Sequence, residues 1–230
     1  ELDAWFSCTV PAIHMLDSRR DARVVASFGP LGKIALMAPE PTALSSLKKV
    51  ALSVGSSPHM RWKKWSKKHH LKARLVDVKT PELTNTLLRE EVDGLVMWDP
   101  WITEWEQQYG WKPLLSESFY SVLIVGEIWA FGDLKDPRVP RLIELFQDAI
   151  QYVKAESDSI DAEVAKLGGW SIDTVRTIRE QNPVFDTGNL GIPSEVRREL
   201  TESRKFVTPG SRAFYSMAEE WQQGFPKREH

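Results

Sequence analysis

One local pattern occurs three times between residues 47 and 105 and constrains the fold of this 230-residue chain. Each copy is an apolar run, then a residue that can cap a helix, then a proline. The runs are 47–54, 73–80 and 93–100, and the cap–proline pairs are Ser57-Pro58, Thr80-Pro81 and Asp99-Pro100. Because proline suits the first helical position, each copy predicts a strand that leads into a helix. Three such units predict an α/β fold with a mainly parallel sheet.

Two of these strand ends carry residues suited to a ligand site. In open α/β sheets, ligands bind at the carboxyl ends of strands, where helix N-termini favour anions. Gly55, Ser56 and Ser57 follow one strand and offer close backbone approach and two hydroxyls. Trp98 ends another strand. The sequence therefore predicts a small-anion site beside an indole ring.

Each residue of this predicted site also has a purely structural interpretation. Gly55-Ser56-Ser57 is equally typical of a tight turn with a capped helix, in which Ser57 is the N-cap. His59 can donate to an anion as a neutral imidazole, or it can be a packing residue. For Asp99 we favour helix capping over ligand binding, because a carboxylate repels an anion.

Two segments together carry a family resemblance: VALSVGSSPHM at 50–60 and VDGLVMWDPW at 92–101. They resemble the extracytoplasmic solute-binding proteins of ABC importers for nitrate, taurine and aliphatic sulfonates, from about Leu2 to about Leu200. The resemblance implies the type II periplasmic-binding-protein fold, with mainly parallel sheets and a helical C-terminal third. Lobe one is expected at 1–35 and 126–230, without the family's first βαβ unit, and lobe two at 36–125.

The resemblance also implies a function. We expect the two lobes to close about a hinge on a small anionic ligand, sulfonate-like or an aromatic or aliphatic acid. The protein is expected to be a periplasmic or extracytoplasmic monomer that delivers this ligand to the membrane subunits of an ABC importer, without cofactor or catalysis. The implied ligand-binding residues are Thr9, Gly55, Ser56, Ser57, His59, Trp98 and Asp99.

Two alternatives on the same fold remain open. Cys8 directly precedes a predicted helix, and a helix N-terminus tends to lower the pKa of a thiol. The fold family includes enzymes, among them a cysteine-dependent sulfinate desulfinase and thiamine-pyrimidine synthases, so Cys8 is the candidate nucleophile of an enzyme. The other alternative is the ligand-sensing domain of a regulator, which requires an attached signalling or DNA-binding domain.

Composition and charge argue against other classes of protein. The net charge is −2, and no apolar run is long enough to predict a transmembrane helix. The segment 61–74 contains seven Lys and Arg residues and no acidic residue. We interpret it as a solvated helix face and expect no nucleic-acid binding. No His, Cys and Asp spacing predicts a metal site.

Overall fold

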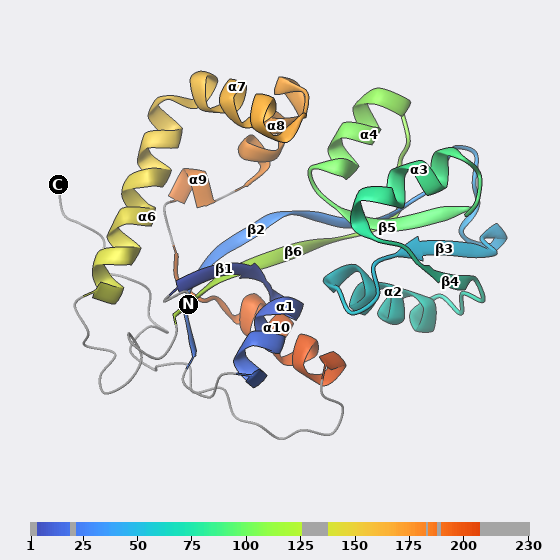
Figure 1. Cartoon of the computed structure of the whole chain (residues 1–230), viewed down its shortest axis with the longest axis horizontal. Helices are drawn as coiled ribbons and strands as arrows, with labels where there is room; N and C mark the ends of the chain where they lie inside the picture. The colour runs from blue at the N-terminus through green and yellow to red at the C-terminus, as the bar shows by residue number, and fades with distance from the viewer. Residues whose placement is uncertain (1–3, 19–21, 126–137, 183, 188–189, 208–230) are drawn as a thin grey trace. The chain divides into compact units, whose positions relative to one another are not determined.

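The computed structural model describes residues 4–18, 22–125, 138–182, 184–187 and 190–207. They form an α/β protein with one mixed six-stranded sheet and a helical C-terminal part (Figure 1). The strands are β1 (Ala4–Cys8), β2 (Arg23–Met37), β3 (Lys49–Leu52), β4 (Arg74–Asp77), β5 (Gly94–Trp98) and β6 (Pro113–Val125). The first helices are α1 (Thr9–Ser18), α2 (Ser57–Lys68), α3 (Leu83–Leu88) and α4 (Trp101–Tyr109), with 3-10 turns η1 (Leu44–Ser46) and η2 (Thr80–Glu82). The later helices are α6 (Arg138–Ala155), α7 (Ser157–Gly168), α8 (Ile172–Gln181), α9 (Val184–Thr187) and α10 (Ser194–Val207).

The sheet order is β1-β6-β2-β5-β3-β4. β3 pairs in parallel with both β4 and β5, as the repeated strand–helix pattern predicts. The expectation of mainly parallel sheets is wrong, because β1 pairs antiparallel with β6 and β2 pairs antiparallel with β5. Parallel neighbours need a long crossover, which α2 supplies between β3 and β4, and which α2, β4 and α3 together supply between β3 and β5. β1 and β2, and β5 and β6, are also joined through helices (α1 and α4) but are not neighbours in the sheet.

The chain divides into two compact units. Unit 1 contains Glu1–Leu31, Tyr120–Ile160 and Asn182–His230, and unit 2 contains Gly32–Phe119 and Asp161–Gln181. The predicted lobe boundaries at 35/36 and 125/126 stay a prediction. The compact units differ from them in placing 32–35 in unit 2 and 120–125 in unit 1, and in grouping most of α7 and all of α8 with unit 2.

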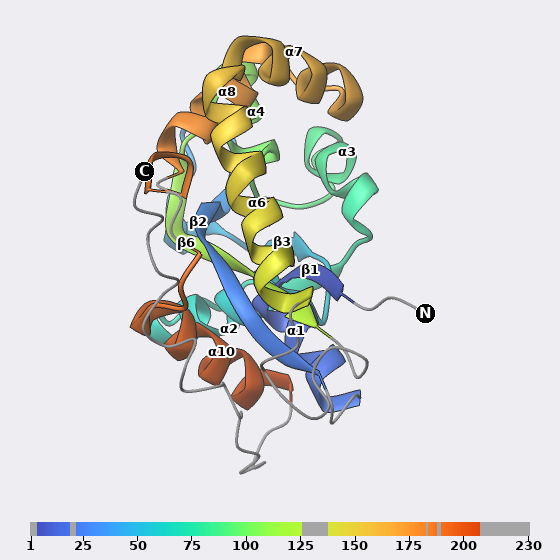
Figure 2. The same cartoon turned by 90° about the vertical axis from the view of Figure 1, so that its left-hand side faces the viewer.

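In unit 1, helices cover both faces of the strands. Along β6, Val122 and Ile124 face α1 and α10, whereas Leu123 and Val125 face α6 and α9. This is the two-residue alternation of a strand that is buried on both sides. Figure 2 shows α6 crossing the strands on one face and α10 on the other.

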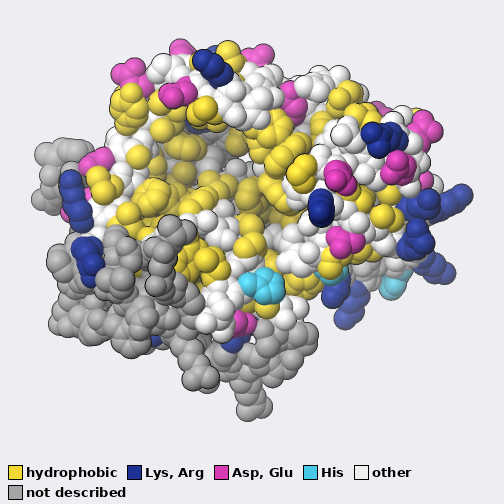
Figure 3. All heavy atoms as spheres, in the orientation of Figure 1, with side chains coloured by type: hydrophobic (Ala, Val, Ile, Leu, Met, Phe, Trp, Pro, Cys, Tyr) yellow, Lys and Arg dark blue, Asp and Glu magenta, His cyan; other side chains and the backbone are white. Residues whose placement is uncertain are grey.

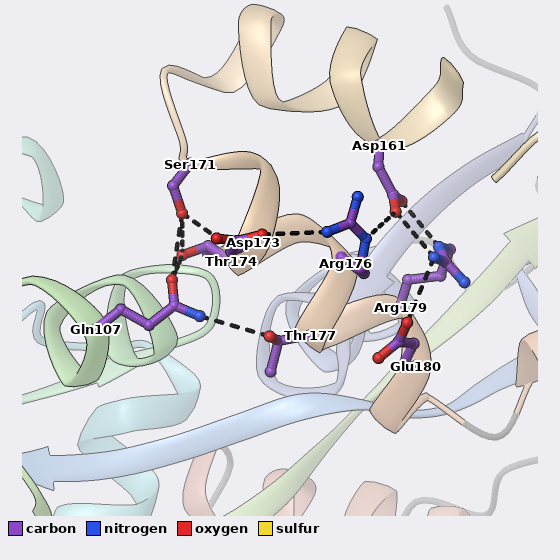
Figure 4. Close-up of polar contacts among 9 residues, drawn as sticks. All are labelled: Gln107, Asp161, Ser171, Asp173, Thr174, Arg176, Thr177, Arg179 and Glu180. Atoms are coloured by element: carbon purple, nitrogen blue, oxygen red, sulfur yellow. Dashed lines mark hydrogen bonds and ion pairs between the residues drawn. The ribbon is translucent and has the colours of Figure 1, made fainter. Parts of the chain in front are cut away.

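Unit 2 repeats the same layering. Ala51 and Leu95 pack under α3 and α4, whereas Leu52 and Val96 pack against Trp62 and Trp65 of α2, among others. Hydrogen bonds and ion pairs attach α8 to α4 and to the start of α7, as Figure 4 shows. These contacts explain why α8 belongs to this unit although it lies far along the chain.

Several sequence-based expectations about the elements need correction. The sequence Gly-Pro-Leu-Gly at 29–32 predicts a break in the chain, but β2 runs through it without interruption. The spacing of Leu83, Leu87 and Leu88 predicts a buried helical face; Leu83 and Leu87 are buried, but Leu88 is exposed. The helix that the sequence predicts at 211–223 lies outside the described residues. None of the helices that the structure describes combines the length and apolarity required to cross a membrane.

Candidate functional site

The turn between β3 and α2 forms the first part of the candidate site. Ser56 has an extended backbone, with φ −94° and ψ 173°, and its Oγ accepts a hydrogen bond from the amide of His59 at 3.4 Å. Ser56 is therefore the N-cap, and the prediction that Ser57 fills this position is wrong by one residue. Proline is tolerated at either of the first two helical positions, because neither amide has an intrahelical partner. The hydroxyl of Ser56 also donates to the carbonyl of Ser53 at 2.5 Å.

Two side chains outside the turn fix its backbone. The amide of Val54 donates to Oδ1 of Asp77 at 2.9 Å, and the amide of Gly55 donates to Nδ1 of His59 at 3.1 Å. Gly55 has φ +84°, a conformation that other residues rarely adopt. Sequence reasoning missed Asp77. The available signal was its position at the end of β4, whose carboxyl end lies at the same edge of the sheet as that of β3.

The surroundings of His59 favour its neutral form, which is the form predicted to donate a hydrogen bond to an anion. Burial lowers its pKa below the usual value, and Lys63 lowers it further, while Asp77 acts in the opposite direction. Because Nδ1 accepts the Gly55 proton, the neutral ring carries its own proton on Nε2. A neutral imidazole N–H in the first turn of a helix can donate to an anion without adding charge.

Trp98 ends β5 at the same edge of the sheet. β3 and β5 are parallel, with Val50 opposite Gly94 and Ala51 opposite Leu95. Continuing this register brings Trp98 beside Val54, at the start of the turn. The Trp98 ring is half-buried and meets the ring of Trp101 edge to face, with centroids 5.7 Å apart. The predicted indole and the predicted anion-binding turn therefore share one edge of unit 2.

Asp99 is a buried hydrogen-bond acceptor. Its Oδ2 accepts from the amide of Lys33 at 2.7 Å, and its Oδ1 accepts from the amide and hydroxyl of Thr103 at 3.1 and 2.8 Å. The carboxylate thus stabilises the first turn of α4, although the residue at the N-cap position is Pro100. Asp99 thus supports the helix start with its side chain, but its predicted place as the N-cap is wrong by one residue, and a ligand contact by Asp99 stays a prediction.

Thr9 and Cys8 lie in unit 1. Thr9 is the first residue of α1 and is buried, where its hydroxyl donates to Glu199 Oε1 at 3.4 Å and accepts from Ser203 at 3.0 Å. Cys8 ends β1 and is half-buried. A ligand contact by Thr9 and a catalytic role for Cys8 both stay predictions. Within the described ranges, no group of three or more His, Cys, Asp or Glu side chains could hold a metal ion.

Comparison with known proteins identifies the fold. No protein-family model and no curated protein matches the chain. Among solved structures, the periplasmic aliphatic sulphonate binding protein SsuA from Escherichia coli is similar, with a TM-score of 0.73 over 89% of this chain and 74% of that one, at 17% identity. This chain has the fold of the periplasmic sulfonate-binding proteins.

Two further structures have the same fold. The alkanesulfonate-binding protein SsuA from Xanthomonas axonopodis pv. citri, bound to MOPS, has a TM-score of 0.64 at 16% identity, over 79% of this chain and 67% of that one. A DszB mutant in complex with biphenyl-2-sulfinic acid also has a TM-score of 0.64, at 14% identity over 96% of this chain and 84% of that one. Binding proteins and DszB therefore share this fold, so the fold alone does not identify the function of this chain.

Proposed function

We propose that this protein is a solute-binding protein that captures a small anionic ligand, sulfonate-like or an aliphatic or aromatic acid, for ABC-type import. The observation that carries the proposal is the Ser56-capped start of α2, which lies at the same strand edge as the Trp98 indole. The shared fold with the SsuA proteins supports it. In this function the protein works outside the cytoplasm, as a monomer, with the membrane subunits of an importer as its partner.

The two parts of the site have different tasks. The acidic head binds at the start of α2, through the first backbone amides, the Nε2–H of His59 and the Ser56 hydroxyl, which turns its proton from the Ser53 carbonyl to the ligand. Each charge-assisted hydrogen bond contributes about 1.5–3 kcal/mol. The Trp98 ring covers the apolar body of the ligand at a small cost in side-chain entropy. Ser57 is buried, so its contribution comes from its backbone. Closure of two lobes on the ligand, with Thr9 as a second contact, stays a prediction.

Calorimetry with MOPS, ethanesulfonate and benzoate tests the proposal. We expect Ser56→Ala and Trp98→Ala each to weaken binding of the best ligand by about tenfold or more, the loss of one good contact. Ser66→Ala is the control on the same helix, since its hydroxyl donates only to the Lys63 carbonyl among the bonds described. Trp111→Ala is the control for loss of an indole. Unchanged binding in both site variants places the site elsewhere.

A second candidate function is a sulfinate-cleaving enzyme with Cys8 as its nucleophile. The favouring observation is the half-buried thiol directly before α1, in a chain that shares its fold with DszB. Incubation with biphenyl-2-sulfinic acid, with sulfite as the measured product, tests it. Turnover that Cys8→Ser abolishes, while binding persists, establishes the enzyme; binding without turnover favours the binding protein.

A further inference from the structure

A pocket lies at the opposite end of α2 from the Ser56 turn. It has a volume of about 380 Å³ and is formed by η1 and the segment between α2 and β4, with the lining residues Leu44, Ser45, Leu47, His69, His70, Leu71 and Lys72. This volume falls in the range of small-ligand pockets. α2 has twelve residues, so the two sites are about 18 Å apart along the helix.

The pocket combines an apolar floor with a rim of donors. Leu47 is buried, and Leu44 and Leu71 are half-buried beside the same core cluster. His69, His70 and Lys72 are exposed, and none of the lining residues is acidic. In the described part of the chain, the side chains of these three residues form no hydrogen bond or ion pair. Two imidazoles, an ammonium group and the Ser45 hydroxyl are thus available to one ligand.

The helix end holds the imidazole of His70 at the rim. The amide of His69 donates to Trp65 O at 2.8 Å, and the amide of Leu71 donates to Ser66 O at 2.9 Å, which closes the last turn. Between them, His70 has φ +53°, in the left-handed region where glycine is usual. This region is uncommon for residues with a side chain, and histidine, like asparagine and aspartate, is enriched among those that adopt it.

The surroundings of the pocket are basic. Lys67 and Lys68, in the last turn of α2, are exposed, and no carboxylate among the described residues forms an ion pair with them. In Figure 3, Lys and Arg side chains gather at the right-hand end of the molecule, where Figure 1 places α2, β3 and β4. Trp62 and Trp65 are buried, so this surface lacks the aromatic faces on which nucleic-acid bases stack.

We propose that this pocket binds a phosphate monoester that carries a short apolar chain. The terminal oxygens of the phosphate accept hydrogen bonds from His69, His70 and Lys72, and the apolar chain lies on the leucine floor. Lys72, with the surrounding lysines, favours the dianionic head over a singly charged acid. A free alkyl phosphate and the headgroup of phosphatidic acid present the same chemistry.

Titration of the whole protein with n-butyl phosphate and with inorganic phosphate, followed by NMR, tests the proposal. We expect n-butyl phosphate to bind about tenfold more tightly, because of its apolar chain, and to shift the imidazole signals of His69 and His70. Lys72→Gln and His70→Asn should each weaken binding about tenfold. Asparagine tolerates the left-handed backbone, so His70→Asn keeps the helix end intact.

Two control variants locate the effect. His14→Asn removes an exposed imidazole in unit 1, and Glu90→Gly removes a side chain at φ +58°, the other positive-φ position without glycine among the described residues. Both should bind n-butyl phosphate like the parent protein.

Vesicles distinguish the two sources of the phosphate. Cosedimentation with phosphatidylcholine vesicles that contain phosphatidic acid, but not with pure phosphatidylcholine, identifies a lipid headgroup. Binding of n-butyl phosphate without cosedimentation identifies a free ester, and either result supports the proposal. Equal affinity for inorganic and n-butyl phosphate, no binding of either, or unchanged binding in Lys72→Gln and His70→Asn overturns it.

Discussion

The carboxylate of Asp77 accepts a hydrogen bond from the backbone amide of Val54 at 2.9 Å. The two residues are far apart in sequence but meet because β3 and β4 are parallel neighbours, with Leu52 opposite Asp77. Asp77 therefore holds the end of one strand from the end of the next. The turn that starts α2 depends on this contact, together with the bond from the Gly55 amide to His59.

Removal of the Asp77 carboxylate should loosen this turn. We expect Asp77→Ala to lower the free energy of unfolding by about 1 kcal/mol, the usual net value of one hydrogen bond. Asp77→Asn retains an acceptor oxygen of the same shape and is the matched control. Urea denaturation measures both variants. An Asp77→Asn variant as unstable as Asp77→Ala would show that charge, and not the hydrogen bond, is the source of the stabilisation.

His59 should make stability depend on pH. Its pKa is lowered in the folded protein, so the unfolded chain binds a proton more readily. The stability that neutral His59 contributes therefore rises with pH between its folded pKa and the unfolded value of about 6.5. This contribution is complete above the unfolded pKa and is lost as the pH falls through the folded pKa. Denaturation at several pH values should show a smaller decrease in His59→Gln than in the parent protein. An equal decrease in both proteins contradicts the assignment to His59.

Much of the sheet and helix pattern was predictable, because its signals are local. The apolar run ahead of Ser56 and the proline at position 58 predict β3 and α2 from adjacent residues alone. The exact cap was not predictable. Ser56 and Ser57 have the same chemistry, and only the extended backbone of Ser56 decides between them.

The missed features depend on contacts between distant parts of the chain. The Asp77 carboxylate accepts a hydrogen bond from the Val54 amide because β3 and β4 are paired. The Asp99 carboxylate accepts one from the Lys33 amide because β2 and β5 are paired. Neither contact can be predicted from the residues next to it in the sequence. The break expected at 29–32 failed for a related reason: glycine and proline predict a turn, but pairing of the flanking residues within the sheet can outweigh that local preference.

Gly32 should be intolerant of any side chain. A Cβ at this position would lie 2.7 Å from Oδ2 of Asp99 and 2.9 Å from its Cβ. The Asp99 carboxylate cannot retreat, because it is bound to Lys33 and Thr103. We expect Gly32→Ala to cost about 2–3 kcal/mol in unfolding free energy.

Gly110→Ala is the matched control for Gly32→Ala. Gly110 has φ +64° and no atom within 4 Å of its virtual Cβ, so the change adds backbone strain alone, about 1 kcal/mol. Urea denaturation of the two variants measures the difference. A loss in Gly32→Ala no greater than that in Gly110→Ala would show that the Asp99 loop shifts without cost.

The ion pair between Asp161 and Arg179 should stabilise the attachment of α8 to α7. Arg179 Nε and the Nη2 nitrogen lie 2.8 and 2.9 Å from the two carboxylate oxygens, and Asp161 is only 1% exposed (Figure 4). Arg179→Met keeps most of the apolar stem but leaves a buried carboxylate with only the weaker contact to Arg176 at 3.9 Å. Because an isolated buried charge is costly, we expect a loss of about 2–4 kcal/mol.

A double-mutant cycle with Asp161→Asn separates this ion pair from simple loss of packing. Asp161→Asn removes the charge that Arg179 neutralises, so Arg179→Met should cost much less in that background, with a coupling energy above about 1 kcal/mol. Arg141→Met is the surface control: its pair with Glu144 is exposed to solvent and should contribute at most about 0.5 kcal/mol. If the Asp161 and Arg179 effects simply add, the bidentate contact does not hold α8 in place, and the Thr174 and Gln107 contacts of α8 with α4 must do so.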